Sequence, residues 1–410
     1  MKVSIITGLL FGGLAFTAYG QADALKVARA KVSTVYKRLA SVPPPAADLE
    51  NWAAAYVAAT DDAGKNAALL TVAQAATAND FFYSRTVRNF ADPETNEGEE
   101  LIEQNLSDYT ATIVGFIRDG LDYRTILYDD VVYIPNAGLN LPYSPENNDS
   151  YAALEELVRT GQQPLAGSLT QSTQTAVTQY PVQAGIYTLR GYGSVFYNDG
   201  TNRSPLRYTF INYLCKDMEE LSDVTRPDIY VRRDVDRTPG GDGEKFRTEC
   251  VGCHAGMDPQ TSAFAFVDFD PEAGRITYSQ TPVPKVNRNN DTFPNGAAVT
   301  GDAWLNIWYE GTNANLGWSK EIKSGNGPKS WGQAMADTEM FPQCMAKRVY
   351  EVVCLQDGTT NLAKANISAM ATQFVAEGHN MKKLFENTAA LCGEQLSFDA
   401  PAAEPAALRK

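Results

Sequence analysis

Histidine is scarce in this chain: its 410 residues include only two, His254 and His379. Two imidazoles cannot build a multi-histidine metal centre, and they exclude a multihaem cytochrome with bis-histidine ligation. Basic residues are also in deficit, because 35 Lys and Arg face 49 Asp and Glu, giving a net charge of −14. Proteins that bind nucleic acid need clustered basic side chains, so we expect no nucleic-acid partner.

Long apolar runs are missing as well, apart from one at the N-terminus. Residues 1–20 have the pattern of a secretory signal peptide: Lys2, an apolar run over 3–16, and the small residues Ala18 and Gly20 at the end. This run is too short to span a bilayer of about 30 Å comfortably, which argues against a membrane anchor. We therefore expect a periplasmic or secreted protein, exported through a cleaved signal peptide, with no transmembrane anchor after cleavage.

Hydrophobic periodicity predicts a mainly α fold. Helical spacing is clearest in these segments: 22–41, 47–60, 62–78, 99–121, 150–161, 206–221, 361–376 and 380–393. Residues 162–205 are rich in Gln, Thr, Gly and Tyr, and we expect irregular structure with short strands there. The sequence of the final residues, 397–410, is that expected of a disordered tail.

The most specific feature is Cys250-Val-Gly-Cys-His254. Cys-x-x-Cys-His is the covalent attachment motif of c-type haem. On a helical turn the two sulfurs lie on one side, where they can bond both vinyl groups of the porphyrin, and the histidine reaches the iron from that side. We therefore predict one covalently attached haem (heme c) held by Cys250 and Cys253, with His254 as the proximal iron ligand.

A Cys-x-x-Cys pair can also serve as a redox-active dithiol, as part of a zinc site or as a disulfide. A thioredoxin-like dithiol needs a strand–turn–helix setting, and the Gly/Asp-rich stretch 234–243 before the motif does not supply it. A zinc site needs four ligands, and no second Cys or Cys/His pair has ligand spacing. A disulfide across Cys-x-x-Cys is strained and uncommon. Covalent haem is the better interpretation, and an export signal agrees with it.

The motif also carries a resemblance. The stretch from Phe246 to Pro259, followed by the apolar run 263–270, resembles exported bacterial monohaem cytochrome-c-like domain proteins of unknown function. Their pattern is Cys-x-x-Cys-His, then Met-Asp-Pro, then a run ending in Phe-Asp. The similarity extends over roughly the last 230 residues, to the segments 184–190, 341–348 and 374–385. It implies a cytochrome module but no particular reaction.

Together these features predict a helical N-terminal domain followed by a loop-rich helical cytochrome-c-like haem domain. The expected boundaries are 1–20 for the signal peptide, 21–180 for the helical N-terminal domain, 181–396 for the c-type haem domain with its C-terminal helices, and 397–410 for the tail.

The four remaining cysteines predict two disulfides, since their number is even and the expected compartment is oxidising. Two further helices are predicted after the turn at 325–328, one to about Met335 and one through Cys354. Cys344 and Cys354 lie ten residues apart on the second of these helices. This spacing separates them by about 15 Å, beyond the limit for a disulfide. Of the two other connectivities, we expect Cys215–Cys344 with Cys354–Cys392.

The distal iron ligand is the least determined part of the site. Met257 lies three residues after His254, on the proximal side of the porphyrin, and cannot reach the opposite face. In small c-type cytochromes the distal methionine arrives from a later loop, which makes Met340 the first candidate, with Met335 second and His379 third. A methionine ligand raises the reduction potential. Both methionines could instead be core residues, and the distal face would then be open.

Several weaker candidates have ordinary alternatives. Arg203 and Arg207 could pair with haem propionates, although surface arginines are the default interpretation. Four aromatic residues could line the haem or simply fill the core: Phe264, Phe266, Phe269 and Trp304. An acidic loop could bind calcium, but it lacks EF-hand spacing and a solvated turn is favoured: Asp234, Asp236, Asp242 and Glu244. No catalytic residue is identified.

These features favour a periplasmic monohaem c-type cytochrome that transfers electrons to or from a redox partner protein. The acidic composition is compatible with a basic partner surface. Two alternatives follow from the length of the chain, which is large for a simple electron shuttle. One is a haem-dependent redox enzyme, such as a peroxidase or oxidase, with an open distal face. The other is a partner-binding protein whose haem domain is structural.

Overall fold

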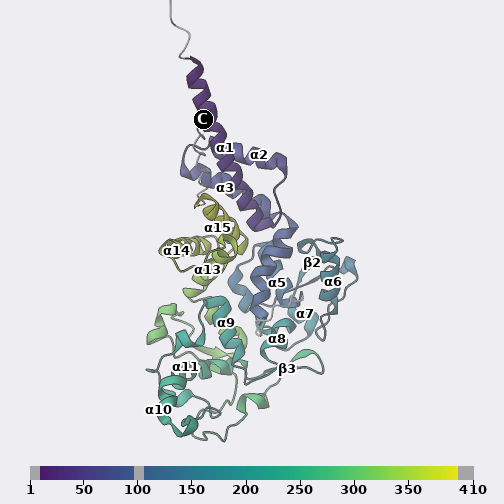
Figure 1. Ribbon diagram of the computed structural model, residues 1–410. Helices are drawn as coiled ribbons and strands as arrows, with labels where there is room; N and C mark the ends of the chain where they lie inside the picture. The colour runs from purple at the N-terminus through teal and green to yellow at the C-terminus, as the bar shows by residue number, and fades with distance from the viewer. Residues whose placement is uncertain (1–9, 97–105, 396–410) are drawn as a thin grey trace, which may run out of the picture. The chain divides into compact units, whose positions relative to one another are not determined.

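Two compact units make up the chain, and the structure, a computed structural model, describes residues 10–96 and 106–395 (Figure 1). Each unit is discontinuous: the first contains residues 1–86, 353–356 and 385–410, and the second contains 87–352 and 357–384. The boundary predicted at residue 180 does not coincide with this division, because residues 87–180 cluster with the later part of the chain. Part of the predicted signal peptide, 1–9, and the predicted tail, 397–410, lie outside the described residues.

The first unit is built from helices (Figure 1), whose buried side chains include Val32, Val35, Leu69 and Val72. These helices are α1 (Leu10–Ala40), α2 (Ala46–Ala58), α3 (Asp62–Thr77) and most of α15 (Met381–Gln395). The Asp61 side chain starts α3 by accepting a hydrogen bond of 2.7 Å from the Gly64 amide. Gly393 lets α15 approach α1, because a methyl group there would lie 2.2 Å from Val35 Cγ2. Helix α1 continues through the predicted cleavage point before Gln21.

The second unit contains the remaining helices. They are α4 (Arg88–Ala91), α5 (Asp108–Asp119), α6 (Asp149–Arg159), α7 (Gln174–Thr178), α8 (Arg190–Phe196), α9 (Ser204–Leu214), α10 (Gly243–Lys245), α11 (Val251–Thr261), α12 (Gly327–Ala336), most of α13 (Met340–Cys354), α14 (Asn361–Ala376) and the start of α15. Among the described residues its strands form three antiparallel pairs: β1 (Val132–Pro135) with β2 (Leu169–Ser172), β3 (Val267–Asp270) with β4 (Arg275–Tyr278), and β5 (Ala303–Leu305) with β6 (Ser324–Asn326).

Helix α5 is the buried centre of this unit. Ser107 caps its first turn, and it ends at Gly120, whose φ of +65° is a left-handed conformation that glycine adopts without strain. The sequence pattern predicted a helix over 99–121; the described part begins at the cap, and residues 97–105 lie outside the description. The buried Asp108 carboxylate accepts hydrogen bonds of 2.8 Å from the amides of Arg190 and Gly191, which fixes the start of α8 against α5.

The mainly α prediction is confirmed. Strands are short and occur in isolated pairs. The stretch 162–205, predicted as irregular structure with short strands, contains one short strand, β2, but also the short helices α7 and α8. The segment 206–221, predicted as one helix, is divided, because Cys215 takes a left-handed conformation after α9 and a short 3-10 turn follows at Met218–Leu221. No helix among the described residues is both long enough and apolar enough to cross a membrane.

Both predicted disulfides are present. Cys215 pairs with Cys344 at a Cα–Cα distance of 5.2 Å, and Cys354 pairs with Cys392 at 5.6 Å. The first bond joins the end of α9 to α13 within the second unit. The second lies within the first unit and ties the end of α13 to α15.

The two disulfides should differ in their contribution to stability, because they close loops of different length. The sequence separations are 129 and 38 residues. Loop-closure entropy gives about 5 kcal/mol for the longer loop and about 4 kcal/mol for the shorter. We expect a Cys215→Ser/Cys344→Ser variant to lose more unfolding free energy than Cys354→Ser/Cys392→Ser, measured by urea denaturation with circular dichroism. The reverse order would contradict this expectation.

Candidate functional site

The Cys-x-x-Cys-His motif begins at Cys250, the last residue of a π-helical turn over Phe246–Cys250, and continues into the first turn of α11. Buried Phe246, Val251 and Ala255 pack with Val231 and fix the inner side of this helical stretch. Cys250, Cys253 and His254 are all half-buried. The local sequence therefore forms a helical turn at the motif, with the side chains of Cys250, Cys253 and His254 partly exposed.

The two motif cysteines are the only unpaired ones among the described residues. The Cys253 thiol donates a hydrogen bond of 3.2 Å to the backbone carbonyl of Met218, and burial raises its pKa. Met218 follows closely after the disulfide-bonded Cys215, so the disulfide holds the segment that borders the motif. With the other four cysteines in disulfides, these two are present as free thiols.

His254 is fixed by a buried carboxylate one helical turn later. Its Nδ1 lies 3.2 and 3.3 Å from the two oxygens of Asp258, whose side chain is 0 % exposed. Although burial raises the pKa of Asp258, the Arg203 guanidinium and His254 outweigh it and hold that pKa well below its usual range. An ionised Asp258 places the imidazole proton on Nδ1 and leaves the Nε2 lone pair for a metal ion.

Two arginines complete this network. Arg203 Nε donates to Asp258 at 2.8 Å, and its terminal nitrogens donate to Asp234 at 2.6 and 2.9 Å. The backbone amide of Arg232 donates to Asp258 at 2.8 Å. The Arg232 guanidinium is buried and donates to Thr261; burial and the nearby Arg203 lower its pKa to about 10.

The default interpretation of Arg203 as a surface residue is wrong. Its side chain is 19 % exposed and lies against Asp258, the residue that orients His254. Arg207 is a surface residue, 46 % exposed and paired with Asp217. Sequence reasoning also missed Asp258 and Arg232. The spacing of four residues between His254 and Asp258 was a usable signal, since such pairs meet on a helix, whereas nothing in the sequence marked Arg232.

Two glycines allow neighbouring segments to approach α11 closely. A methyl group on Gly252 would lie 2.2 Å from Ser222 Oγ, and one on Gly256 would lie 2.0 Å from Trp308 Nε1. The Asp223 amide also donates to the Gly252 carbonyl at 3.0 Å. The two glycines are one helical turn apart, so one face of α11 lies against Ser222 at Gly252 and against the buried Trp308 at Gly256.

The segment 223–231, which lies next to α11, exposes two large apolar side chains. Val224 is 56 % exposed and Ile229 is 68 % exposed. This segment is anchored to α11 at both ends, through Asp223 on the Gly252 carbonyl and Val231 in the core beneath Val251. Half-buried thiols, an oriented imidazole and neighbouring exposed aliphatic groups fit an apolar planar cofactor, because a porphyrin needs both covalent anchors and apolar cover.

The three candidates for the distal ligand lie elsewhere in the second unit. Met335 is fully buried in α12, and Met340 is half-buried at the start of α13. The His379 ring packs edge-on against Phe374, and its Nδ1 lies 3.7 Å from Asp122. Among the described residues, no hydrogen bond or ring contact joins any of the three to the Cys250–His254 segment. Met340 as the distal ligand therefore stays a prediction.

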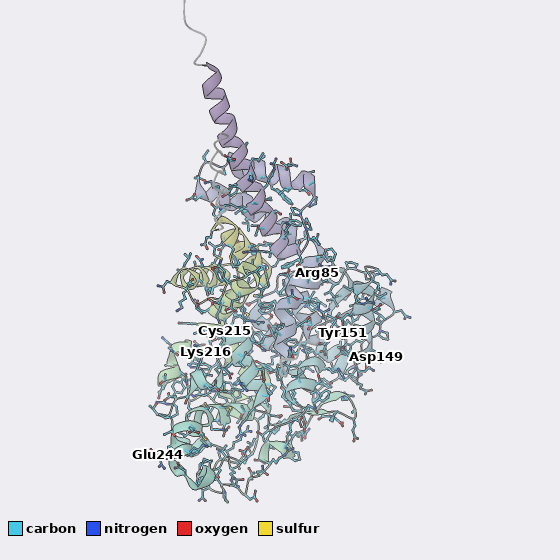
Figure 2. All side chains as sticks on the ribbon, viewed as in Figure 1. Arg85, Asp149, Tyr151, Cys215, Lys216 and Glu244 are labelled. Atoms are coloured by element: carbon cyan, nitrogen blue, oxygen red, sulfur yellow. A yellow bond between two sulfur atoms is a disulfide. The ribbon has the colours of Figure 1, made fainter. Side chains whose placement is uncertain are left out.

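The weaker candidates have structural roles. Phe264 packs against Tyr187 and Trp331, the Trp304 indole donates to Ser330, and Phe269 packs near Gly193, so these are core residues. Phe266 packs against Tyr278. In the acidic loop, Asp236 and Asp242 accept hydrogen bonds from nearby amides, as in ordinary turns (Figure 2 labels Glu244 in this stretch). No group of three or more potential metal-ligating side chains occurs in the described ranges.

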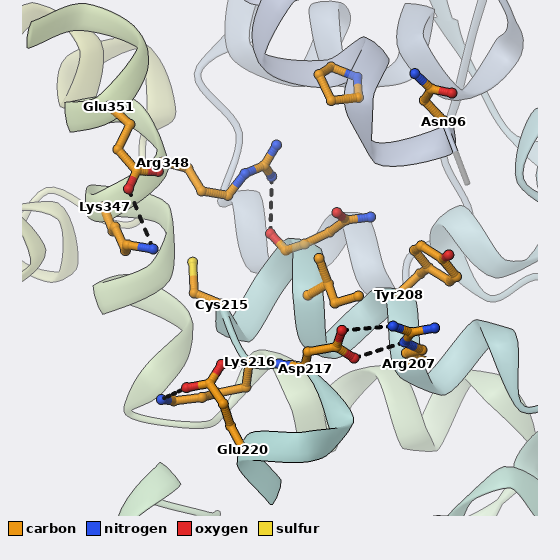
Figure 3. A pocket seen from close by; sticks show the side chains of 13 residues that line it. Asn96, Arg207, Tyr208, Cys215, Lys216, Asp217, Glu220, Lys347, Arg348 and Glu351 are labelled. Carbon is orange, nitrogen blue, oxygen red and sulfur yellow. Dashed lines mark hydrogen bonds and ion pairs between the residues drawn. The ribbon is translucent and has the colours of Figure 1, made fainter. Parts of the chain in front are cut away.

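A cavity of about 700 Å³ lies beside the Cys215–Cys344 disulfide (Figure 3). Six of its charged side chains pair with one another: Arg207 with Asp217, Lys216 with Glu220, and Lys347 with Glu351. The seventh, Arg348, pairs with the buried Glu94 behind the lining. Because each of these charges has a partner in the protein, the cavity gives no evidence of a ligand site.

Comparison with known proteins adds no assignment: no protein-family model matches the chain, and neither the curated proteins nor the solved structures include a match. The resemblance to exported cytochrome-c-like proteins therefore stays a prediction from the motif residues.

The close contact at Gly256 gives a direct test of the local packing. Gly256→Ala should lower the unfolding free energy by about 1–3 kcal/mol, because the buried Trp308 must move to admit the new methyl group. Gly301→Ala is the matched control, since its methyl group would meet nothing within 4 Å. Urea denaturation measures both variants, and equal effects would contradict the described packing of α11.

Proposed function

We propose that this chain is an exported monohaem c-type cytochrome that transfers electrons. One observation carries the proposal: the Cys-x-x-Cys-His motif lies on a helical turn with two free, accessible thiols, and its histidine is oriented through Nδ1 by a buried carboxylate. Cys250 and Cys253 would hold the haem through thioethers, and His254 would ligate the iron through Nε2. A covalently bound haem supplies one-electron chemistry.

The cysteine pattern supports export. Disulfides persist in oxidising compartments, and the structure pairs four cysteines while leaving the two motif cysteines free. Together with the signal-peptide pattern of residues 1–20, this arrangement favours the periplasm or the exterior of the cell. In electron transfer, the chain would accept one electron from a donor protein and pass it to an acceptor. The net charge of −14 favours a partner with a basic surface.

The second candidate function is a haem-dependent redox enzyme. The contact between His254 and Asp258 favours this candidate. A carboxylate on Nδ1 makes an axial imidazole a stronger electron donor, which stabilises oxidised iron. An enzyme also needs an open distal coordination position, whereas an electron carrier works with both positions filled. The state of the distal face therefore separates the two candidates.

Covalent attachment is tested by the mass of the intact protein after export in a host that matures c-type cytochromes. We expect the mature chain plus one haem, retained after acid–acetone extraction. A Cys250→Ala/Cys253→Ala variant should lose the covalent haem, whereas the control Cys354→Ser/Cys392→Ser should keep it. A wild-type mass equal to the bare polypeptide would contradict the proposal.

The distal ligand is tested by the weak near-infrared band that a sulfur–iron bond gives in oxidised haem proteins. We expect the wild-type protein to show this band, Met340→Ala to lose it, and the control Met335→Leu to keep it. A band unchanged in Met340→Ala would exclude Met340. A wild-type spectrum that is high-spin and lacks the band would contradict electron transfer and favour the enzyme.

A further inference from the structure

We propose that Asp258 and Arg203 are positioning residues that together set the reduction potential of the haem iron through His254. This inference rests on the proposed haem attachment, and it assigns a role to side chains that lie outside the attachment motif. The starting observation is a continuous chain of contacts: His254 to Asp258, Asp258 to Arg203, and Arg203 to Asp234.

The carboxylate has little freedom to move. Its two oxygens accept from His254, from Arg203 at 2.8 Å and from the Arg232 amide at 2.8 Å, and the side chain is fully buried. Because solvent does not reach it, its charge is screened little. The hydrogen bond to Nδ1 is therefore a fixed property of the site.

A hydrogen bond to a carboxylate pulls the Nδ1 proton away from the imidazole more strongly than one to a neutral carbonyl. The imidazole then carries more electron density on Nε2 and becomes a stronger donor to iron. A stronger donor stabilises ferric over ferrous iron, so Asp258 lowers the reduction potential. Hydrogen bonding to an axial ligand is one of the ways in which a protein adjusts a haem potential.

Arg203 acts in the opposite direction. Its guanidinium neutralises part of the Asp258 charge, which weakens the pull on the Nδ1 proton. Arg203 also pairs with Asp234, so its positive charge is shared between two carboxylates. Its guanidinium nitrogens lie 2.6 Å from an Asp234 oxygen and 2.8 Å from an Asp258 oxygen. The potential therefore depends on how the charge of Arg203 is shared.

A purely structural role for Asp258 makes a different prediction. Its contacts also hold the Arg232 backbone against α11, so its loss would reduce stability whether or not the haem potential changed. Stability alone cannot separate the two roles, and the midpoint potential can.

The test compares midpoint potentials of exported holoproteins. At the solution potential where the wild type is half reduced, Asp258→Asn should shift the ratio of reduced to oxidised haem about tenfold toward the reduced form, equivalent to about 59 mV for one electron. Asp234→Asn is the matched control: it removes the same charge from the same network without touching His254, and its shift should be clearly smaller. Equal shifts, or no shift, in the two variants would overturn the proposal.

A second variant guards against misfolding of Asp258→Asn. The double substitution Arg203→Gln/Asp234→Asn preserves net charge and leaves Asp258 with less compensation. It should lower the midpoint potential, and an unchanged or higher potential would overturn the proposal. Intact mass is measured on every sample, so a chain without covalent haem counts against the proposed function, whereas a normal haem content with unmoved potentials counts against this inference alone.

Discussion

The buried carboxylate of Asp258 is the interaction on which the candidate site depends. It joins three parts of the second unit, because it accepts from His254 on α11, from Arg203 before α9 and from the backbone of Arg232. Removing one partner from a buried ion pair typically costs about 3–5 kcal/mol, since a charge is left without compensation. The contacts that orient the proposed iron ligand therefore also connect these segments, and orientation and stability are coupled at this position.

A second constraint is covalent. The Cys215–Cys344 disulfide ends α9, and within three residues the chain reaches the Met218 carbonyl that accepts from Cys253. The left-handed conformation of Cys215, with φ of +53°, turns the chain toward the motif. The flank of α11 is thus set by a cross-link of a kind that persists in oxidising compartments. The proposed covalent haem attachment would take place in the same kind of compartment, so the disulfide is compatible with the proposed export.

Much of the fold could be predicted from local sequence signals, because periodicity and turn residues act over short distances. The helix predicted at 361–376 matches α14, and helical geometry excluded the Cys344–Cys354 pairing. Long-range packing could not be predicted in this way. The boundary between the two compact units after Thr86 depends on contacts between residues that are far apart in the sequence, and periodicity does not report those contacts. The burial of Arg203 was missed for the same reason, since its partners Asp234 and Asp258 are 31 and 55 residues away. The motif located the candidate site, but only the structure revealed the residues that orient it.

The proposed function requires one haem held through two thioether bonds, at Cys250 and Cys253. The pyridine haemochrome spectrum of the purified, exported protein tests it most directly, because the position of the α-band reports how many porphyrin vinyl groups have been saturated. We expect one haem per chain and the α-band position that two thioethers give. A band at the position of haem with both vinyl groups intact, or a protein that carries no haem after export with the maturation machinery present, would contradict it.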